Sequence, residues 1–199
     1  MSSRIVMLAL ACALAAPSLA SAQSGNYIFQ ADPEGRYTGG APVGKLFMRY
    51  GMSPVARSTV SFPSSEKAGT IVINTRERRL YYVLGDGRAI RYGIGVGRDG
   101  FTWGGVQTVS AKREWPDWTP PAQMLQRRPD LPRYMPGGPD NPLGARAMYL
   151  GSTLYRIHGS NEPETIGEAV SSGCFRMTNS DVIDLYDRVK VGTKVVVQR

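Results

Sequence analysis

Residues 157–177, with the sequence IHGSNEPETIGEAVSSGCFRM, organise the chain. This stretch contains the only histidine, His158, and the only cysteine that lies beyond the first twelve residues, Cys174. A cysteine acts as a nucleophile in its thiolate form, and a histidine is the usual base that removes its proton. The Gly, Pro and Ser residues between the two favour a loop that folds back on itself, so the stretch predicts a thiol active site.

The residues on either side of this stretch predict a mainly β domain that begins near Gly69. The composition, with 23 Gly and 14 Pro, favours strands and loops over a helical bundle. Runs rich in β-branched and aromatic residues alternate with turn signals, of which Asp86-Gly87 is typical of a hairpin. One of these runs ends directly before His158. The expected strands are 70–74, 80–84, 89–96, 106–113, 147–150, 153–157 and 194–198.

A helix is expected shortly after Cys174. Thr178 or Asn179 is suited to cap its first turn, and an apolar face continues to about Lys190. The partial positive charge of a helix N-terminus stabilises a thiolate and later an oxyanion. Gly173, directly before the cysteine, leaves room for a substrate carbonyl to approach the backbone.

His158 has the chemistry of a general base toward the thiol and of a general acid toward a leaving amine. No carboxylate stands at an evident position to orient its ring, so the carbonyl of Gly159 is expected to do so. The alternative, a structural histidine near an inert buried cysteine, fits poorly with a cysteine in a glycine turn. A metal site is not expected, because one His and one Cys do not make a ligand cluster. Arg176 stays open between binding a substrate carboxylate and pairing with a nearby acid.

The N-terminal residues 1–22 are expected to be a cleaved signal peptide. A positive residue, Arg4, precedes a short apolar run, and Ala20-Ser21-Ala22 has the A-x-A pattern of a cleavage site. An uncleaved anchor is the alternative, but the run is too short to span a bilayer. Cys12 falls within the apolar run and is expected to leave with it. The mature protein then keeps a single cysteine, which excludes a disulfide framework and suits a thiol that is used.

Two segments outside the predicted core have a distinct composition. Residues 23–68 are rich in Gly, Pro, Ser and Arg and are expected to form a flexible arm. Residues 114–142 contain eight prolines and are expected to be a lid or binding loop, with a short helix at 121–126. The net charge of +8 suits anionic polymers or membrane surfaces, whereas nucleic acid is not an expected partner because no recognition motif occurs.

The pattern His158-Gly-Ser followed by Ser-Ser-Gly-Cys-Phe-Arg at 171–176 resembles the signature of L,D-transpeptidase catalytic domains, the YkuD-like family. The resemblance extends over about residues 69–198 and includes Phe-Thr-Trp-Gly at 101–104 and the segment 135–146. Many members of the family have a histidine where this chain has Ser172. This departure leaves His158 as the sole candidate base.

The resemblance implies a mixed β-sandwich with a short helix after the cysteine, residues 69–199 forming the catalytic domain, and a periplasmic peptidoglycan enzyme without metal or organic cofactor. In such an enzyme Cys174 attacks the L-centre carbonyl of meso-diaminopimelate in a tetrapeptide stem and releases D-Ala. The acyl group then passes to another stem as a 3→3 cross-link, to an outer-membrane protein or lipoprotein, to a D-amino acid or to water.

The resemblance also implies a set of contacts around the thiol. Ser171, Ser172 and Gly173 are expected around the oxyanion, and Arg176, Trp103 and Tyr149 are expected to contact the substrate. Carbapenem-type β-lactams are expected to acylate the cysteine. Two other readings remain open: an L,D-carboxypeptidase that hydrolyses the same bond, and a non-catalytic module that binds the cell wall.

Overall fold

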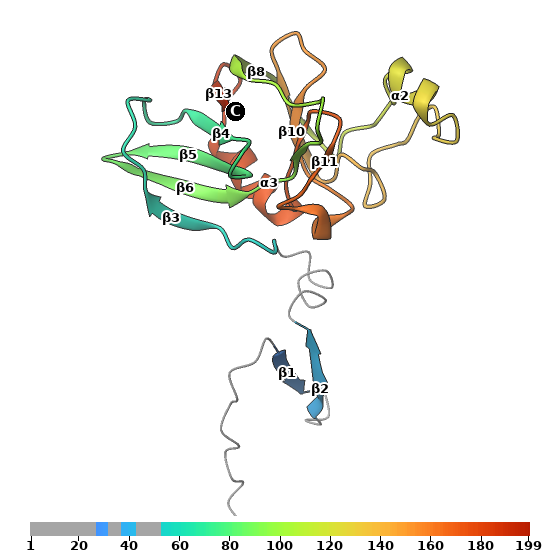
Figure 1. Ribbon diagram of the computed structural model, residues 1–199, viewed down its shortest axis with the longest axis horizontal. Helices are drawn as coiled ribbons and strands as arrows, with labels where there is room; N and C mark the ends of the chain where they lie inside the picture. Colours follow the sequence, from blue (N-terminus) through green and yellow to red (C-terminus); the bar gives the residue numbers. More distant parts are fainter. Residues whose placement is uncertain (1–26, 32–36, 43–52) are drawn as a thin grey trace, which may run out of the picture.

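The computed structural model describes residues 27–31, 37–42 and 53–199, and most of its elements are strands (Figure 1). Strands β1 (Tyr27–Ala31) and β2 (Tyr37–Pro42) pair with each other in antiparallel orientation. The predicted signal peptide lies outside the described residues, so it stays a prediction. Among the residues that are described, no helix is long and apolar enough to cross a membrane.

A nine-stranded sheet forms the body of the domain. Its strands are β3 (Ser58–Ser61), β4 (Ile71–Asn74), β5 (Arg79–Gly85), β6 (Arg88–Gly93), β8 (Gly105–Glu114), β9 (Arg146–Leu150), β10 (Arg156–His158), β12 (Phe175–Arg176) and β13 (Lys194–Gln198). They are ordered β12-β10-β9-β8-β13-β4-β5-β6-β3. The pairs β10–β12 and β13–β4 are parallel and the other pairs are antiparallel, so the expectation of a mainly β fold with a mixed sheet is confirmed.

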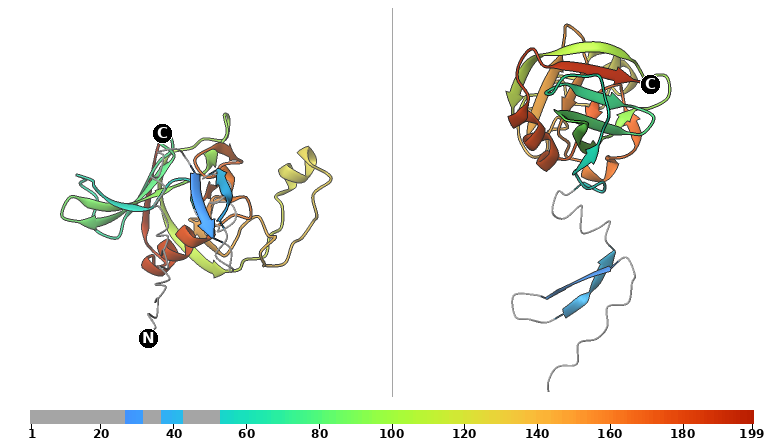
Figure 2. Two further views of the ribbon diagram at one scale, coloured as in Figure 1. Left: turned by 90° about the horizontal axis from the view of Figure 1, so that it is seen from below. Right: turned by 90° about the vertical axis from the view of Figure 1, so that its left-hand side faces the viewer.

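Strand β8 is the corner of this sheet. Residues 105–108 pair with β13, whereas residues 109–114 pair with β9, and the register with β9 shifts between Val109 and Ala111. A bulge of this kind bends a strand and lets it serve two packed halves of a sheet. The two halves enclose a common interior, as the right-hand view of Figure 2 shows. The core accordingly joins side chains from both halves, such as Leu80 and Phe175.

Helix α3 (Asn179–Arg188) packs into this core and confirms the expected helix after the cysteine. Thr178 caps it, because its side chain accepts a hydrogen bond from the Asp181 backbone N–H at 3.3 Å. The buried apolar residues of α3 are Val182 and Leu185, and Val189, directly after the helix, is buried as well. The expected short helix in the proline-rich segment is also present, as α2 (Ala122–Arg127).

Three expected strands or segments differ from what the sequence predicts. The strand expected at 89–96 ends at Gly93, where its pairing with β5 ends. Gly95 instead exchanges two backbone hydrogen bonds of 2.9 Å with Arg176. The strand expected at 153–157 is confined to β10, because the Thr153 side chain bonds to the Leu150 carbonyl and the Tyr155 N–H and forms a turn. Within the segment predicted to be a flexible arm, β3 is an edge strand that pairs with β6.

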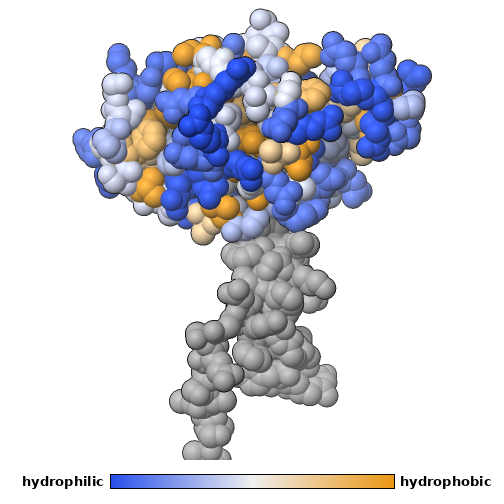
Figure 3. All heavy atoms as spheres, in the orientation of Figure 1, coloured by the Kyte–Doolittle hydropathy of each residue, from blue (hydrophilic) through white to orange (hydrophobic). Residues whose placement is uncertain are grey.

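Two short strands connect the corner of the sheet to the loop that carries the cysteine. Strand β7 (Val96–Gly97) pairs in parallel with β11 (Ala169–Ser171), and Arg98 N–H donates to the Ser171 carbonyl at 3.1 Å. This ladder fixes the chain directly before the cysteine. On the face shown in Figure 3, apolar residues are interspersed among hydrophilic ones, as is usual for a protein surface.

Candidate active site

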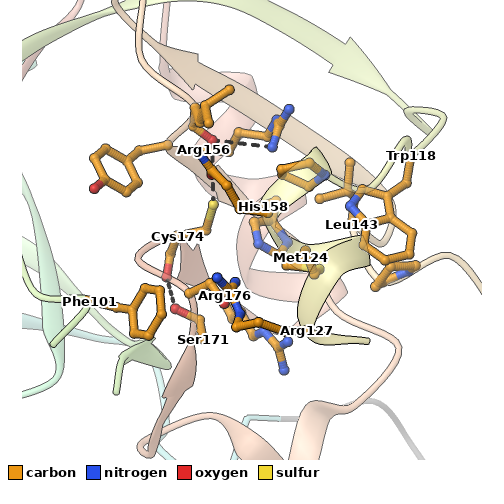
Figure 4. Close-up of a pocket in the computed structure, with 16 residues that line it drawn as sticks. Phe101, Trp118, Met124, Arg127, Leu143, Arg156, His158, Ser171, Cys174 and Arg176 are labelled. Carbon is orange, nitrogen blue, oxygen red and sulfur yellow. Dashed lines mark hydrogen bonds between the residues drawn. The ribbon is translucent and has the colours of Figure 1, made fainter. Parts of the chain in front are cut away.

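The register of β10 and β12 brings the predicted site residues together. In this parallel pair, Ile157 lies opposite Phe175 and His158 lies opposite Arg176. Side chains alternate between the faces of a strand, so Ile157 and Phe175 enter the core, where both are buried, while His158 and Arg176 project to the other face. Cys174 immediately precedes β12 and lines the same cavity as His158 and Arg176 (Figure 4).

The cavity has a volume of about 340 Å³. Its lining comes from the cysteine loop, from β10 and from the proline-rich segment, which supports the expectation that this segment is a binding loop. The side chains of Trp118 and Met124 stand across the cavity from the cysteine in Figure 4. The proline-rich segment contributes Trp118, Pro121, Gln123, Met124, Arg127 and Pro142 to the lining.

The ring of His158 is held by a backbone carbonyl, as the sequence predicts. Its Nδ1 lies 2.6 Å from the Gly159 carbonyl oxygen. A carbonyl can only accept, so Nδ1 carries the proton and Nε2 keeps a free lone pair. Gly159 is itself fixed, because its N–H donates to the Arg146 carbonyl at 3.0 Å. The tautomer is therefore the one that can remove a proton through Nε2.

The electrostatic environment keeps His158 neutral. Burial lowers the pKa of His158 to about 3, the charge of Arg176 acts in the same direction, and the Gly159 carbonyl opposes them. The side chain is buried, with 4% of its surface exposed. At neutral pH the imidazole is thus in the unprotonated form that a general base requires.

The thiol of Cys174 is neutral as well. Burial raises the pKa of Cys174, and the nearby Arg156 and Arg176 oppose this shift. The Sγ atom lies 3.8 Å from the Leu154 carbonyl, to which the S–H group donates. The sequence predicts a thiolate stabilised by histidine, but the structure holds a thiol beside a neutral imidazole, because desolvation disfavours both charges. The strand β12 also stands between the thiol and the start of α3.

The loop before the cysteine is fixed by Ser171 and Trp103. The Ser171 hydroxyl accepts from the Gly173 N–H at 3.1 Å and donates to the Cys174 carbonyl at 2.6 Å. The Trp103 Nε1–H donates to the Gly173 carbonyl at 3.0 Å. Gly173 has a φ of +104°, and a Cβ there would lie 2.5 Å from the Tyr155 ring, so only glycine suits this position. The expected role of Gly173 and Ser171 near the thiol therefore takes the form of a rigid turn.

Two residues expected to contact substrate do not line the cavity. Trp103 stacks on Tyr155, with ring centroids 4.6 Å apart, and supports the cysteine loop from behind. Tyr149 lies on β9, where its ring carries the guanidinium of Arg156 at 5.0 Å from the centroid. These side chains support residues of the cavity wall, and their contact with a substrate stays a prediction. Ser172 does line the cavity.

Arg176 and Arg156 complete the surroundings of the thiol. Arg176 lines the cavity and forms an ion pair with Glu162, at 2.9 Å between Nη1 and Oε2, so the alternative of a nearby acid is realised. Arg156 also lines the cavity and is not among the site residues predicted from the sequence. Its position two residues before His158 on the same strand was the available signal, because such residues share a face.

Comparison with known proteins agrees with this geometry. A family model described as the L,D-transpeptidase catalytic domain matches residues 68–197. The chain therefore belongs to the L,D-transpeptidase catalytic-domain family, and the resemblance of the signature is confirmed. An Escherichia coli K12 protein named "Probable L,D-transpeptidase ErfK/SrfK" is 42% identical over 142 residues, which are 67% of this chain and 44% of that protein. This chain thus spans less than half the length of that relative.

Solved structures are similar as well. L,D-transpeptidase 3 from Mycobacterium tuberculosis, in complex with a faropenem-derived adduct, has a TM-score of 0.53 at 19% identity, and the match covers 66% of this chain and 60% of that one. A Brucella melitensis protein named as a probable carnitine operon oxidoreductase is 50% identical, with a TM-score of 0.50 and coverage of 73% of this chain and 94% of that one. That name points to another activity, whereas the family model and the curated relatives agree on L,D-transpeptidases.

Proposed function

We propose that this protein is a cysteine-dependent L,D-transpeptidase that forms 3→3 cross-links between peptidoglycan stem peptides. The observation that carries the proposal is the pairing of β10 with β12, which brings His158, in its Nδ1–H tautomer, and Cys174 into one cavity. Membership of the L,D-transpeptidase family supports the reaction class.

The first half-reaction acylates the enzyme. The Cys174 proton moves to His158 Nε2 as Sγ bonds to the carbonyl carbon at the L-centre of diaminopimelate. The tetrahedral intermediate collapses with cleavage of the carbon–nitrogen bond, and His158 returns the proton to the departing amine of D-Ala. Gly173 N–H already donates to Ser171, so the oxyanion falls to other N–H groups of the loop.

The second half-reaction transfers the acyl group. An amine of another stem attacks the thioester carbonyl, His158 takes up the amine proton, and breakdown of the intermediate returns that proton to the Cys174 sulfur. Water in place of the amine gives hydrolysis to a tripeptide. No metal or organic cofactor enters these steps, which remains part of the proposal.

The test is incubation of the protein with purified disaccharide-tetrapeptide, followed by mass spectrometry. Matched samples contain Cys174→Ala and Cys174→Ser. A cross-linked dimer that requires Cys174 is the expected product, together with released D-Ala. Tripeptide without dimer assigns the protein to the L,D-carboxypeptidases. Absence of both products, with Cys174→Ala still bound to purified sacculi, overturns the enzyme and leaves a wall-binding module.

The proposal extends to β-lactams. The faropenem-derived adduct of the M. tuberculosis L,D-transpeptidase 3 supports the expectation that carbapenems acylate Cys174. Intact-protein mass spectrometry should show the addition of one carbapenem to the wild type and none to Cys174→Ala. An unchanged mass of the wild-type protein would contradict this extension.

We further propose that the protein works in the periplasm and that an outer-membrane protein or lipoprotein can replace the second stem as acceptor. The predicted signal peptide, with Arg4 and the Ala20-Ser21-Ala22 pattern, supports the location. Cell fractionation with N-terminal sequencing checks it, and a mature protein that begins at Gln23 is expected. Recovery of uncleaved protein in the cytoplasmic fraction would contradict the location.

A further inference from the structure

Arg156 places a positive charge beside the thiol. Its Nη1 donates to the Leu154 carbonyl at 3.2 Å, and the same carbonyl oxygen lies 3.8 Å from Cys174 Sγ. The dashed lines from Arg156 and Cys174 in Figure 4 meet at this oxygen. The guanidinium and the nucleophile are therefore held next to each other by one backbone group.

The charge of Arg156 is not neutralised by the protein. Within residues 53–199, no carboxylate lies within ion-pair distance of Arg156, and its Nε is buried without a hydrogen-bond partner. Its guanidinium lies over the Tyr149 ring, with Cζ 5.0 Å from the ring centroid. An arginine in the cavity wall without a carboxylate partner is suited to an anionic group that arrives with the substrate.

The other arginines of the cavity differ from Arg156. Arg176 is engaged by Glu162 at 2.9 Å. Arg127 is exposed to solvent, and its guanidinium lies 5.3 Å from the centroid of the Phe101 ring. A charge that is screened by water or by an acid binds an anion weakly compared with a partly desolvated, unpaired one. Of the three cavity arginines, Arg156 is thus the one that is both partly buried and without a carboxylate partner among the described residues.

We propose that Arg156 is a specificity-determining residue that binds the C-terminal carboxylate of the residue released from the donor stem. This inference rests on the proposed function for the identity of the substrate. The carboxylate of a released terminal residue is three bonds from the attacked carbonyl carbon, so it lies close to Sγ during attack. A guanidinium held at the same carbonyl oxygen as Sγ is placed to meet it. The enzyme thereby recognises donors that end one residue after the attacked carbonyl.

The principal experiment measures binding without turnover. Calorimetry compares a tetrapeptide stem with a free C-terminus and the same stem as its C-terminal amide, on Cys174→Ala and on the double variant Cys174→Ala/Arg156→Gln. Cys174→Ala should bind the acid about 10- to 100-fold more tightly than the amide, as expected for a charge-assisted, bidentate hydrogen bond. The double variant should bind acid and amide within about threefold of each other.

Control variants separate recognition from general effects of charge. Arg156→Lys keeps the charge without the planar fork and should restore only part of the preference. Arg76→Gln removes an exposed arginine on the β4–β5 turn, away from the cavity, and should leave the preference intact. Equal binding of acid and amide by Cys174→Ala, or a preference that survives in the double variant, would overturn the inference.

Turnover distinguishes this inference from the proposed function. If Arg156 binds the leaving carboxylate, Arg156→Gln in the active protein lowers kcat/KM much more for the acid than for the amide; the smaller loss for the amide reflects the missing charge beside the thiol. A uniform loss for both substrates, with slower alkylation of Cys174 by iodoacetamide, would mean that Arg156 acts only on the thiol and would overturn the inference. If Cys174→Ala binds the acid more tightly than the amide but the wild-type protein forms no cross-links, the inference is sustained and the proposed reaction is overturned.

Discussion

The two ends of the nine-stranded sheet are built in different ways. At one end, β4, β5 and β6 form a meander of consecutive strands joined by short turns, with regular antiparallel pairing. At the other end, β10 and β12 are three and two residues long, pair in parallel and are separated by the loop that leads to the cysteine. The meander supplies stability through local contacts, whereas the short strands supply position through contacts from distant parts of the chain. The site is accordingly the region where small changes should affect activity more than stability.

The largest expected effect comes from the buried imidazole of His158, at the end of the sheet that carries the site, and is on the pH dependence of the free energy of unfolding. The folded protein keeps His158 neutral down to a pH of about 3, whereas the unfolded chain takes up a proton near its ordinary pKa of 6.5. The unfolded state thus binds more protons between these values, and the free energy of unfolding falls as the pH falls from 6.5 toward 3, by about 1.4 kcal/mol per pH unit from this residue. Above pH 6.5 this contribution is fully present.

His158→Gln provides the measurement. His158 is the only histidine, so the difference between the wild-type and variant curves of unfolding free energy against pH reports this residue alone. The wild type should lose stability in acid more steeply than the variant. Parallel curves between pH 6.5 and 4 would mean that the imidazole is not held neutral.

The second prediction concerns the meander. Leu80 on β5 is fully buried in the core, so Leu80→Ala should lower the free energy of unfolding by about 2–5 kcal/mol. At a temperature where the variant remains folded, kcat/KM should stay within about twofold of wild type, because the site does not draw on this residue. Denaturant unfolding and a kinetic assay check the two statements. A large loss of kcat/KM in folded Leu80→Ala would contradict the statement that the meander affects stability and not activity.

The third prediction tests the cysteine loop. Gly173→Ala places a methyl group against the Tyr155 ring, at a residue whose φ of +104° strains any side chain. The free energy of unfolding should fall by about 1–3 kcal/mol. Displacement of the thiol should reduce kcat/KM about 100-fold. Gly192→Ala is the matched control, because Gly192 has a φ of +91° in open space after α3. It shares the backbone strain and should keep its activity. An active Gly173→Ala would show that the turn is adaptable.

The smallest effect is expected at Trp103. Trp103→Phe keeps an aromatic ring against Tyr155 but removes the hydrogen bond from Nε1 to the Gly173 carbonyl. The free energy of unfolding should fall by about 0.5–1.5 kcal/mol, and kcat/KM should fall by up to about tenfold. Trp115→Phe, at an exposed tryptophan, is the control and should behave as wild type. If Trp103→Phe raised only KM, the side chain would belong to substrate binding, as the family resemblance implies.

The sequence predicts those features that depend on neighbouring residues. The meander, the helix after the cysteine and the bond from His158 to the Gly159 carbonyl all follow from local patterns and are present in the structure. The resting charge of the thiol does not follow, because it depends on burial in the folded chain, which raises the pKa of Cys174. The direction in which a side chain faces does not follow from the local pattern either. Trp103 stacks on Tyr155, which is far away in sequence, and Tyr149 lies under Arg156 of the neighbouring strand.

The position of β13 in the sheet has a consequence for the order of folding. Residues 194–198 follow every other strand of the sheet in sequence, yet they lie in its middle, between β8 and β4. Before this strand docks, the domain consists of two partial sheets, each with an open edge where β13 belongs. Such edges pair readily with other chains. We therefore expect the two halves of the domain to join in one late step, when β13 pairs with both of them.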